Sequence, residues 1–156
     1  MNTLLKREFA PIPEAAWAMI DAEASRILKG NLSARALVDF SGPHGPEKAA
    51  VNLGSVTALD DASVAGVAWG LRDVLPLAEF RAPFALSMAD LDQVARGGVT
   101  PDLSAVVAAA QKAALFEEKA LYFGLSKDRM QGLLTASTHK PVALPKEAQG
   151  YPVVLE

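Results

Sequence analysis

The sequence contains few side chains that could carry out catalysis or hold a metal ion. Its two histidines, His44 and His139, stand in segments rich in turn-forming residues, and neither belongs to a metal-ligand motif. Cysteine is absent, which excludes disulfides, thiolate metal sites and cysteine nucleophiles. We therefore expect both histidines in surface loops, and we expect no metal site.

Neighbouring carboxylates are the other groups that could do chemistry. Glu117 and Glu118 would suit a di-iron site only within a Glu-x-x-His motif, and the residue three places after Glu118 is Leu121. Adjacent residues also point about 100° apart on a helix. Asp90 and Asp92, two residues apart on a short helix, diverge as well. We expect these acids to be solvated or ion-paired.

Motifs for nucleophilic catalysis and for nucleotide binding are missing from the sequence. It has no Gly-x-Ser-x-Gly elbow, no phosphate-binding glycine loop and no dinucleotide fingerprint. A serine triad would need one of the histidines together with an acid that the sequence does not identify. These observations predict a protein that is not an enzyme and that uses no cofactor.

Length and composition indicate one domain with a large share of apolar residues. The chain has 156 residues, of which 51% are hydrophobic and 21% are charged. Its mean hydropathy of +0.18 is high for that charge content. Charged residues interrupt the apolar runs before the roughly 18 residues that a membrane-spanning helix needs. The apolar excess therefore points to a core or to a subunit interface.

The charge of the chain and its N-terminal residues limit the cellular location and the classes of binding partner that we expect. The net charge is -3 and the basic residues are dispersed, which disfavours binding to nucleic acid. Charged residues and prolines near the N-terminus leave no continuous apolar stretch for a secretory signal. We expect a cytoplasmic protein that binds neither nucleic acid nor a membrane.

The first half of the chain predicts one amphipathic helix followed by two strands. Pro13 suits the first turn of a helix, and Gly30 suits its end. Strands are expected at 36–40 and 49–56, separated by the turn-forming residues 41–46. One face of the helix carries apolar residues at helical spacing: Trp17, Ile20, Ala24, Ile27 and Leu28.

The segment 77–88 alternates between apolar and polar side chains. Such a period of two predicts a long strand with one apolar face. Because about 12 residues exceed the usual strand length in a small domain, we expect this strand to project as an arm, with 67–74 as its candidate pairing partner. Its exposed edge would then need a neighbouring subunit to cover it.

Two helices are expected in the second half of the chain. Ser87 and Asp90 fit a capping box in its looser form, which opens a short helix that stops at 97–98. Thr100 supplies an N-cap for an alanine-rich helix from Pro101 to Phe123, and Gly124 suits the position just after its end. Beyond residue 134 the sequence is rich in turn-forming residues and ends just after the apolar residues 153–155. We therefore expect a chain that is a fragment or one half of a split subunit.

Several motifs together resemble those of one protein family. The chain from Met1 to about Leu134 is similar to the N-terminal part of an encapsulin shell protein of family 1, the linocin-like group. The resemblance implies an α+β protein with the tailed-bacteriophage major capsid fold of the Hong Kong phage type. It rests on LLKREFAPI near the N-terminus, VLPLAEFRAPFALSMADLD at 74–92, Arg96-Gly97, Pro101-Asp102-Leu103, and ALFEEKALYFGL at 114–125.

The resemblance also implies a division of the chain. Residues 1–40 would form the N-terminal helix and a lumen-facing segment, and residues 41–92 would form the extended loop, or arm. Residues 93–156 would begin the peripheral domain, with its spine helix at 101–123. The axial domain would be absent or contributed by a separate chain, so a complementary C-terminal fragment is an expected partner.

The implied function is that of a structural subunit. Copies would assemble into an icosahedral shell around a cargo enzyme, such as a dye-decolorising peroxidase or a ferritin-like protein, held through its C-terminal targeting peptide. Carried over from the family, the groove for that peptide comprises Leu28, Leu32, Arg35 and Asp39. The subunit interface comprises Phe80, Arg81 and Phe84, with Glu79 beside Arg81 as a second ion-pairing group.

The sequence departs from the family pattern at two places, and two other functions remain open. Residues 46–48 are Pro-Glu-Lys where many relatives have Trp-Glu-Tyr, and Ala89 replaces a tryptophan associated with flavin in some relatives, so no flavin site is expected. A phage or prophage major capsid protein is the first alternative; the balanced charge of residues 1–29 offers no arm for packaged DNA. A secreted bacteriocin or protease is the second, disfavoured by the missing signal, cysteine and triad.

Overall fold

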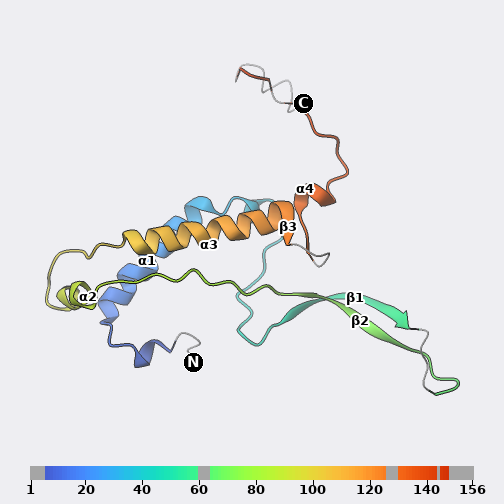
Figure 1. Ribbon diagram of the computed structural model, residues 1–156, viewed down its shortest axis with the longest axis horizontal. Helices are drawn as coiled ribbons and strands as arrows, with labels where there is room; N and C mark the ends of the chain where they lie inside the picture. Colours follow the sequence, from blue (N-terminus) through green and yellow to red (C-terminus); the bar gives the residue numbers. More distant parts are fainter. Residues whose placement is uncertain (1–5, 60–63, 126–129, 144, 148–156) are drawn as a thin grey trace.

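The protein is a mixed helix and strand structure. The computed structural model describes residues 6–59, 64–125, 130–143 and 145–147. In chain order these contain η1 (Arg7–Phe9), α1 (Glu14–Asn31), η2 (Ala34–Ala36), β1 (Ala50–Leu59), β2 (Trp69–Pro76), α2 (Met88–Ala95), α3 (Ser104–Phe123), β3 (Gly124–Leu125), β4 (Met130–Gln131) and α4 (Leu133–Ala136). The helices α1 and α3 lie side by side, α2 sits at one end of them, and the β1–β2 hairpin extends from the other end (Figure 1).

The first helix, α1, starts and ends close to where the sequence predicts. Pro13 is its N-cap, one position before the first turn in which the sequence places it. Its predicted apolar face is turned inward: Ile20 and Ile27 are buried, and Trp17, Ala24 and Leu28 are half-buried. Ala16, also buried, joins Ile20, Leu91 and Val106 in the small core that α1 shares with α2 and α3.

The short helix α2 begins with the serine cap of the predicted capping box. The Ser87 side chain accepts a hydrogen bond from the Asp90 backbone N–H at 3.4 Å, which satisfies one of the free donors of the first turn. Leu91, with 1% of its surface exposed, faces the core. The helix stops at Arg96, where Gly97 takes a positive φ of 76°.

The long helix α3 begins at Ser104, so the predicted start at Pro101 is wrong. The Asp102 carboxylate accepts a hydrogen bond from the Ser104 N–H at 2.8 Å, and this local turn keeps 101–103 outside the helix. Ala109, Ala110 and Ala114 are buried, and their small side chains allow α1 to approach closely. The helix ends at Phe123, as the sequence predicts, and is followed by Gly124, whose φ of 83° favours glycine.

The segment after α1 corrects a second prediction. Residues 36–40 form no strand; the chain instead makes the η2 turn at Ala34–Ala36. The Glu118 carboxylate of α3 accepts hydrogen bonds from Ser33 and from the Ala34 N–H. These contacts turn the backbone at the point where an extended path would otherwise begin.

The β1–β2 hairpin confirms the strand predicted at 49–56 and extends it to Leu59. The two strands are antiparallel, from Ala50 opposite Pro76 to Leu59 opposite Trp69, with an irregularity between Asn52 and Val56. Gly54 lies in that irregularity with φ of 81°, which is typical of a bulge glycine. Most of the hairpin side chains are exposed, on both faces.

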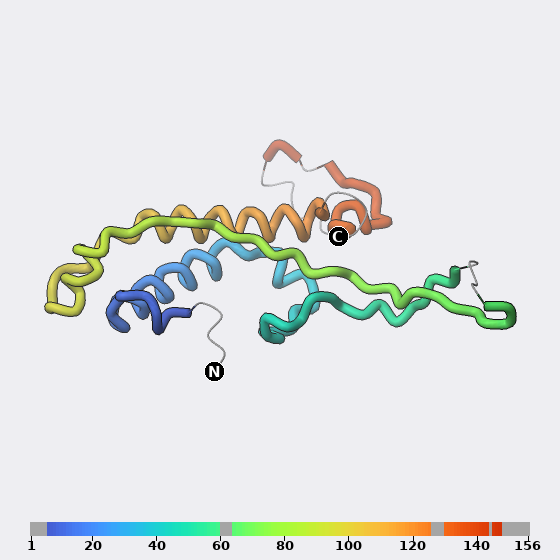
Figure 2. Tube along the Cα trace, turned by 60° about the horizontal axis from the view of Figure 1, so that its bottom comes forward, coloured from blue at the N-terminus to red at the C-terminus, as the bar shows by residue number. Residues whose placement is uncertain are grey.

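The segment 77–87 overturns the prediction of a long projecting strand. It is extended but belongs to no strand of the described residues; the Leu77 N–H donates to the carbonyl of Ala49, the residue before β1, at 2.9 Å. It runs back along α3 instead of projecting (Figure 2). The Phe80 ring lies 4.7 Å from that of Phe116 on α3. The element that projects is the β1–β2 hairpin.

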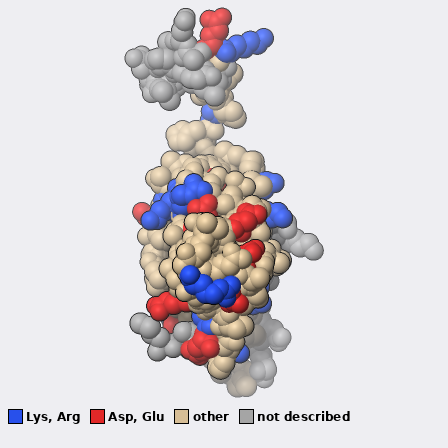
Figure 3. Space-filling view, turned by 90° about the vertical axis from the view of Figure 1, so that its left-hand side faces the viewer, with Lys and Arg blue, Asp and Glu red and all other residues tan. Residues whose placement is uncertain are grey.

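Charged side chains of both signs are interspersed on the end of the molecule near α2, without a large patch of one sign (Figure 3). None of the helices in the described part of the chain is long and apolar enough to span a membrane. The apolar residues 153–155, on which the prediction of a truncated chain partly rests, lie outside the described residues.

Candidate functional site

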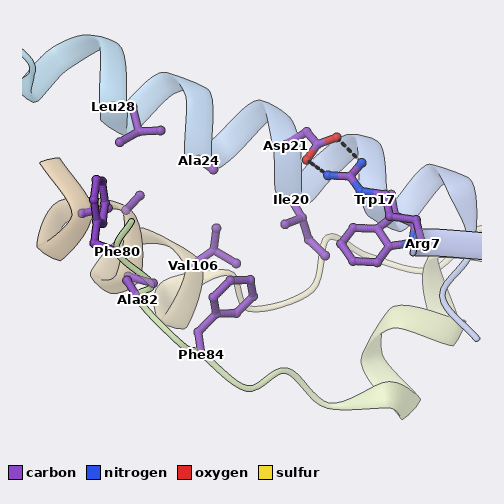
Figure 4. Close-up of a pocket in the computed structure, with 13 residues that line it drawn as sticks. Arg7, Trp17, Ile20, Asp21, Ala24, Leu28, Phe80, Ala82, Phe84 and Val106 are labelled. Atoms are coloured by element: carbon purple, nitrogen blue, oxygen red, sulfur yellow. Dashed lines mark hydrogen bonds and ion pairs between the residues drawn. The ribbon is translucent and has the colours of Figure 1, made fainter. Parts of the chain in front are cut away.

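The candidate site is a groove between α1, α3 and the extended segment 77–87. Its volume is about 470 Å³. Side chains of α1 point from one side toward those of the extended segment and of α3 (Figure 4). Its lining is mostly apolar and comprises Arg7, Trp17, Ile20, Asp21, Ala24, Leu28, Phe80, Ala82, Phe84, Val106, Ala109, Ala110 and Ala113.

One end of the groove is polar and is formed by the N-terminal segment. Arg7 donates two hydrogen bonds to the Asp21 carboxylate, both at 2.6 Å, and its guanidinium lies 4.4 Å from the centre of the Trp17 ring. The hydrogen bond from Arg7 holds the pKa of Asp21 below its usual value. Arg7 Nε and Trp17 Nε1 are buried without an acceptor among the described residues. This cluster fastens η1 to α1.

The four residues predicted for a cargo groove do not lie together in this cavity. Leu28 lines it, and Leu32 is half-buried just beyond the end of α1. Arg35 is engaged elsewhere: its Nε and Nη2 donate to the Glu117 carboxylate at 2.5 and 2.8 Å, and its guanidinium lies 4.6 Å from the Phe40 ring centre. Asp39 is exposed. The structure brings only Leu28 into the cavity.

Glu117 and Glu118 form a second polar cluster, with the turn after α1. Glu118 accepts from the Ser33 hydroxyl at 2.5 Å and from the Ala34 N–H at 2.9 Å, and the Tyr122 hydroxyl lies 3.3 Å from Ser33 Oγ. The Ser33 hydroxyl first, and then the Ala34 N–H, hold the pKa of Glu118 below its usual value. The expectation of an ion pair is confirmed for Glu117, which pairs with Arg35, whereas Glu118 instead accepts hydrogen bonds from the turn.

The predicted interface residues are also placed by contacts within the chain. Phe80 and Phe84 line the groove, although 41% and 46% of their surfaces remain exposed. Arg81 does not line the groove; it pairs with Glu79 two residues earlier, at 2.5 Å, and both side chains are largely exposed. Alternate residues of the segment, Phe80, Ala82 and Phe84, therefore line the groove, whereas the ion pair lies outside it.

Metal-ligating side chains are dispersed over the part of the chain that the structure describes. Within the ranges that it describes, no three His, Cys, Asp or Glu side chains come close enough to hold an ion. His44 is exposed, and its Nε2 lies 2.9 Å from the Ser41 hydroxyl. His139 is exposed as well.

Several groove residues were not identified from the sequence. Arg7 and Asp21 are 14 residues apart, and no motif signals that they pair. Val106, Ala109, Ala110 and Ala113 do recur at helical spacing on α3. That spacing could have indicated that one face of α3 meets α1, but not that the segment 80–84 would close the side of the groove.

Comparison with known proteins adds a family to this geometry. The family model described as "Encapsulating protein for peroxidase" matches residues 1–155. The chain is 40% identical over 155 residues to the type 1 encapsulin shell protein of Mycolicibacterium paratuberculosis, covering 99% of this chain and 58% of that protein. It is 38% identical to the corresponding proteins of Mycobacterium tuberculosis and Rhodospirillum rubrum, covering 99% of this chain and 58% and 57% of theirs.

The matched relatives are longer than this chain. The chain spans somewhat more than half the length of the relatives that it matches. The match nevertheless runs through every described element, from η1 to α4. This chain therefore belongs to the encapsulin shell protein family.

Proposed function

We propose that this chain is a structural, non-catalytic part of a shell subunit. In this proposal, copies of the subunit assemble into a closed icosahedral compartment built on the tailed-bacteriophage capsid fold, in the cytoplasm. Family membership over residues 1–155 supports the structural role. The proposal includes the division of the chain into an N-terminal segment up to residue 40, an arm up to residue 92 and the start of the peripheral domain, all within the capsid fold.

The observation that carries the proposal is the apolar surface that the chain leaves uncovered. On the β1–β2 hairpin, Leu53, Val56 and Leu71 are between 57% and 59% exposed. An isolated two-stranded hairpin is marginal in water, and its edges are open to other chains. Burial of such side chains is worth roughly 25 cal/mol per Å². Contacts with neighbouring subunits would therefore stabilise the hairpin.

A complementary polypeptide is part of the proposal. The relatives extend beyond the matched region by about two fifths of their length. We propose that a complementary C-terminal part, on the same or a separate polypeptide, supplies the axial domain. The subunit interface would include Phe80, Arg81 and Phe84.

We propose that the cargo binds near the turn after α1. We place the site for the cargo's C-terminal targeting peptide beside Leu28 and Leu32, with Arg35 and Asp39 as polar neighbours. The family description names a peroxidase as the encapsulated protein. That description supports a peroxidase, such as a dye-decolorising peroxidase, as the proposed cargo; a ferritin-like protein is the alternative that the family resemblance suggests.

Native mass spectrometry and electron microscopy of the protein isolated from its own cells would test the proposal. We expect closed particles that contain this chain and release a cargo enzyme when they are disrupted. Particles filled with DNA would favour the phage capsid alternative. A folded 16.4 kDa monomer without a partner chain would contradict assembly altogether.

A further inference from the structure

The turn after α1 is held almost entirely by polar contacts with α3. Residues 33–37 form only the two backbone bonds of η2, from the Ala36 N–H to the Ser33 carbonyl at 3.1 Å and from the Leu37 N–H to the Ala34 carbonyl at 2.9 Å. Such a short 3₁₀ turn has little stability alone. Ala34 is fully buried, but Leu37 and Phe40 are 66% and 61% exposed. Apart from Ala34, apolar packing therefore does little to fix the direction of the chain here.

Two adjacent carboxylates of α3 supply the missing constraint. Glu118 acts on the backbone, because it accepts from the Ala34 N–H at 2.9 Å as well as from the Ser33 hydroxyl. Glu117 acts on the neighbouring side chain, because it accepts two hydrogen bonds from Arg35. The contacts join residues more than 80 positions apart in the chain. We call Glu117 and Glu118 the carboxylate clamp.

The clamp also changes what Arg35 can do. A free guanidinium would attract a carboxylate from an incoming peptide. Here two of its donor nitrogens already face Glu117, and 40% of the Arg35 side chain is exposed. An acidic peptide would have to displace an internal carboxylate whose effective concentration is high. The masked Arg35 therefore disfavours acidic peptides in comparison with neutral ones.

We propose that Glu118 is the positioning residue for the turn at 33–37, and that Glu117 is a specificity residue that masks Arg35 from acidic peptides. The second role rests on the proposed cargo site, whereas the first does not. Neither carboxylate needs to touch the cargo.

Amide hydrogen exchange in the intact protein tests the positioning role. Glu118→Gln retains the shape of the side chain but loses its charge, so we expect the Ala34 amide to exchange roughly tenfold faster. Glu23→Gln is the matched control, because Glu23 pairs with Arg26 on α1 at 2.6 Å and does not contact the turn. Exchange in the core of α3 monitors the overall fold. Unchanged exchange at Ala34 in a folded Glu118→Gln protein would overturn the clamp.

Binding of two probe peptides to the intact protein tests the masking role. The probes are labelled octapeptides rich in Leu and Gly, identical except for one Glu in place of Gln. We expect the wild type to prefer the Gln peptide, and Glu117→Gln to improve binding of the Glu peptide about three- to tenfold at low salt. An equal change for both peptides would overturn masking. If neither peptide binds, the cargo site and the masking role both fail, and the exchange experiment still decides the positioning role.

Discussion

The helical body and the β1–β2 hairpin are stabilised in different ways. In the body, Ile20, Leu91 and Val106 are buried between three helices, and the Arg7–Asp21 and Arg35–Glu117 pairs connect distant parts of the chain. In the hairpin the strands contact mainly each other, and the apolar side chains face outward. The difference indicates that the body holds its own shape, whereas the hairpin depends on what covers it.

Removal of a core side chain should give the largest effect on the body. Leu91→Ala leaves a cavity between α1, α2 and α3 and should lower the free energy of unfolding by about 2–5 kcal/mol. Leu53→Ala, at a hairpin position that is 57% exposed, should change it by less than about 0.5 kcal/mol. Urea unfolding of the dissociated protein, followed by circular dichroism, measures both. Equal losses of unfolding free energy in the two variants would contradict the proposed difference between the helical body and the hairpin.

Aromatic truncations on the extended segment should rank next, and they concern assembly. Phe80→Ala removes a half-exposed ring that packs on Phe116, and we expect it to weaken particles by about 1–2 kcal/mol per subunit. Phe84→Ala should act similarly. Arg81→Ala removes only an exposed pair with Glu79 and should cost no more than about 0.5 kcal/mol. Midpoints of particle disassembly in denaturant would compare the three, and similar midpoints would count against an apolar interface.

The cluster of Arg7, Asp21 and Trp17, which joins η1 to α1, should contribute less to the free energy of unfolding. Arg7→Ala removes the pair with Asp21 and the contact with the Trp17 ring, and we expect a loss of about 1 kcal/mol, because both side chains are partly exposed to solvent. Arg26→Ala, which removes a local pair within α1, is the control and should have a smaller effect. Thermal unfolding measures both variants. Equal shifts in Tm would show that the contacts of Arg7 stabilise the fold no more than the local pair of Arg26.

The smallest effect should be a dependence on acid pH. Because the pKa of Asp21 is lower in the folded protein than in the unfolded chain, its contribution is complete above the unfolded pKa, near about 3.9, and is lost as the pH falls through the folded value. Asp21→Asn should therefore be less stable than the wild type at pH 6 and should lose less stability below about pH 4. Asp92→Asn, an exposed position on α2, is the control. If the stability of Asp21→Asn fell with decreasing pH as steeply as that of the wild type, Asp21 would not be the source of the pH dependence.

Local signals in the sequence predicted the helices of the body well. The cap at Ser87, the helical spacing of Trp17 to Leu28 and the glycine at 124 each depend on residues within a few positions of one another. The alternation at 77–88 was equally clear, and it correctly separated the groove side, with Phe80 and Phe84, from the ion pair of Glu79 and Arg81. It did not predict that this segment would lie on helices instead of joining a sheet.

The candidate site was less predictable than the helices. The family resemblance singled out Leu28, which lines the cavity, and Arg35, which does not. Nothing in the sequence indicated that Glu118 would bind the backbone of Ala34, because the two residues are 84 positions apart. Helix periodicity shows which side chains face inward, but it does not show which distant residues they meet.

The sequence by itself determined where the three main helices form, because caps, glycines and apolar periodicity act within one or two turns. It also determined the family. Only the tertiary structure decided the path of 77–87, the partners of Glu117 and Glu118, and the groove between α1 and α3. A period of two is common to a paired strand and to an extended chain lying on helices, and the choice between them depends on whether a pairing edge or an apolar helix face is nearby.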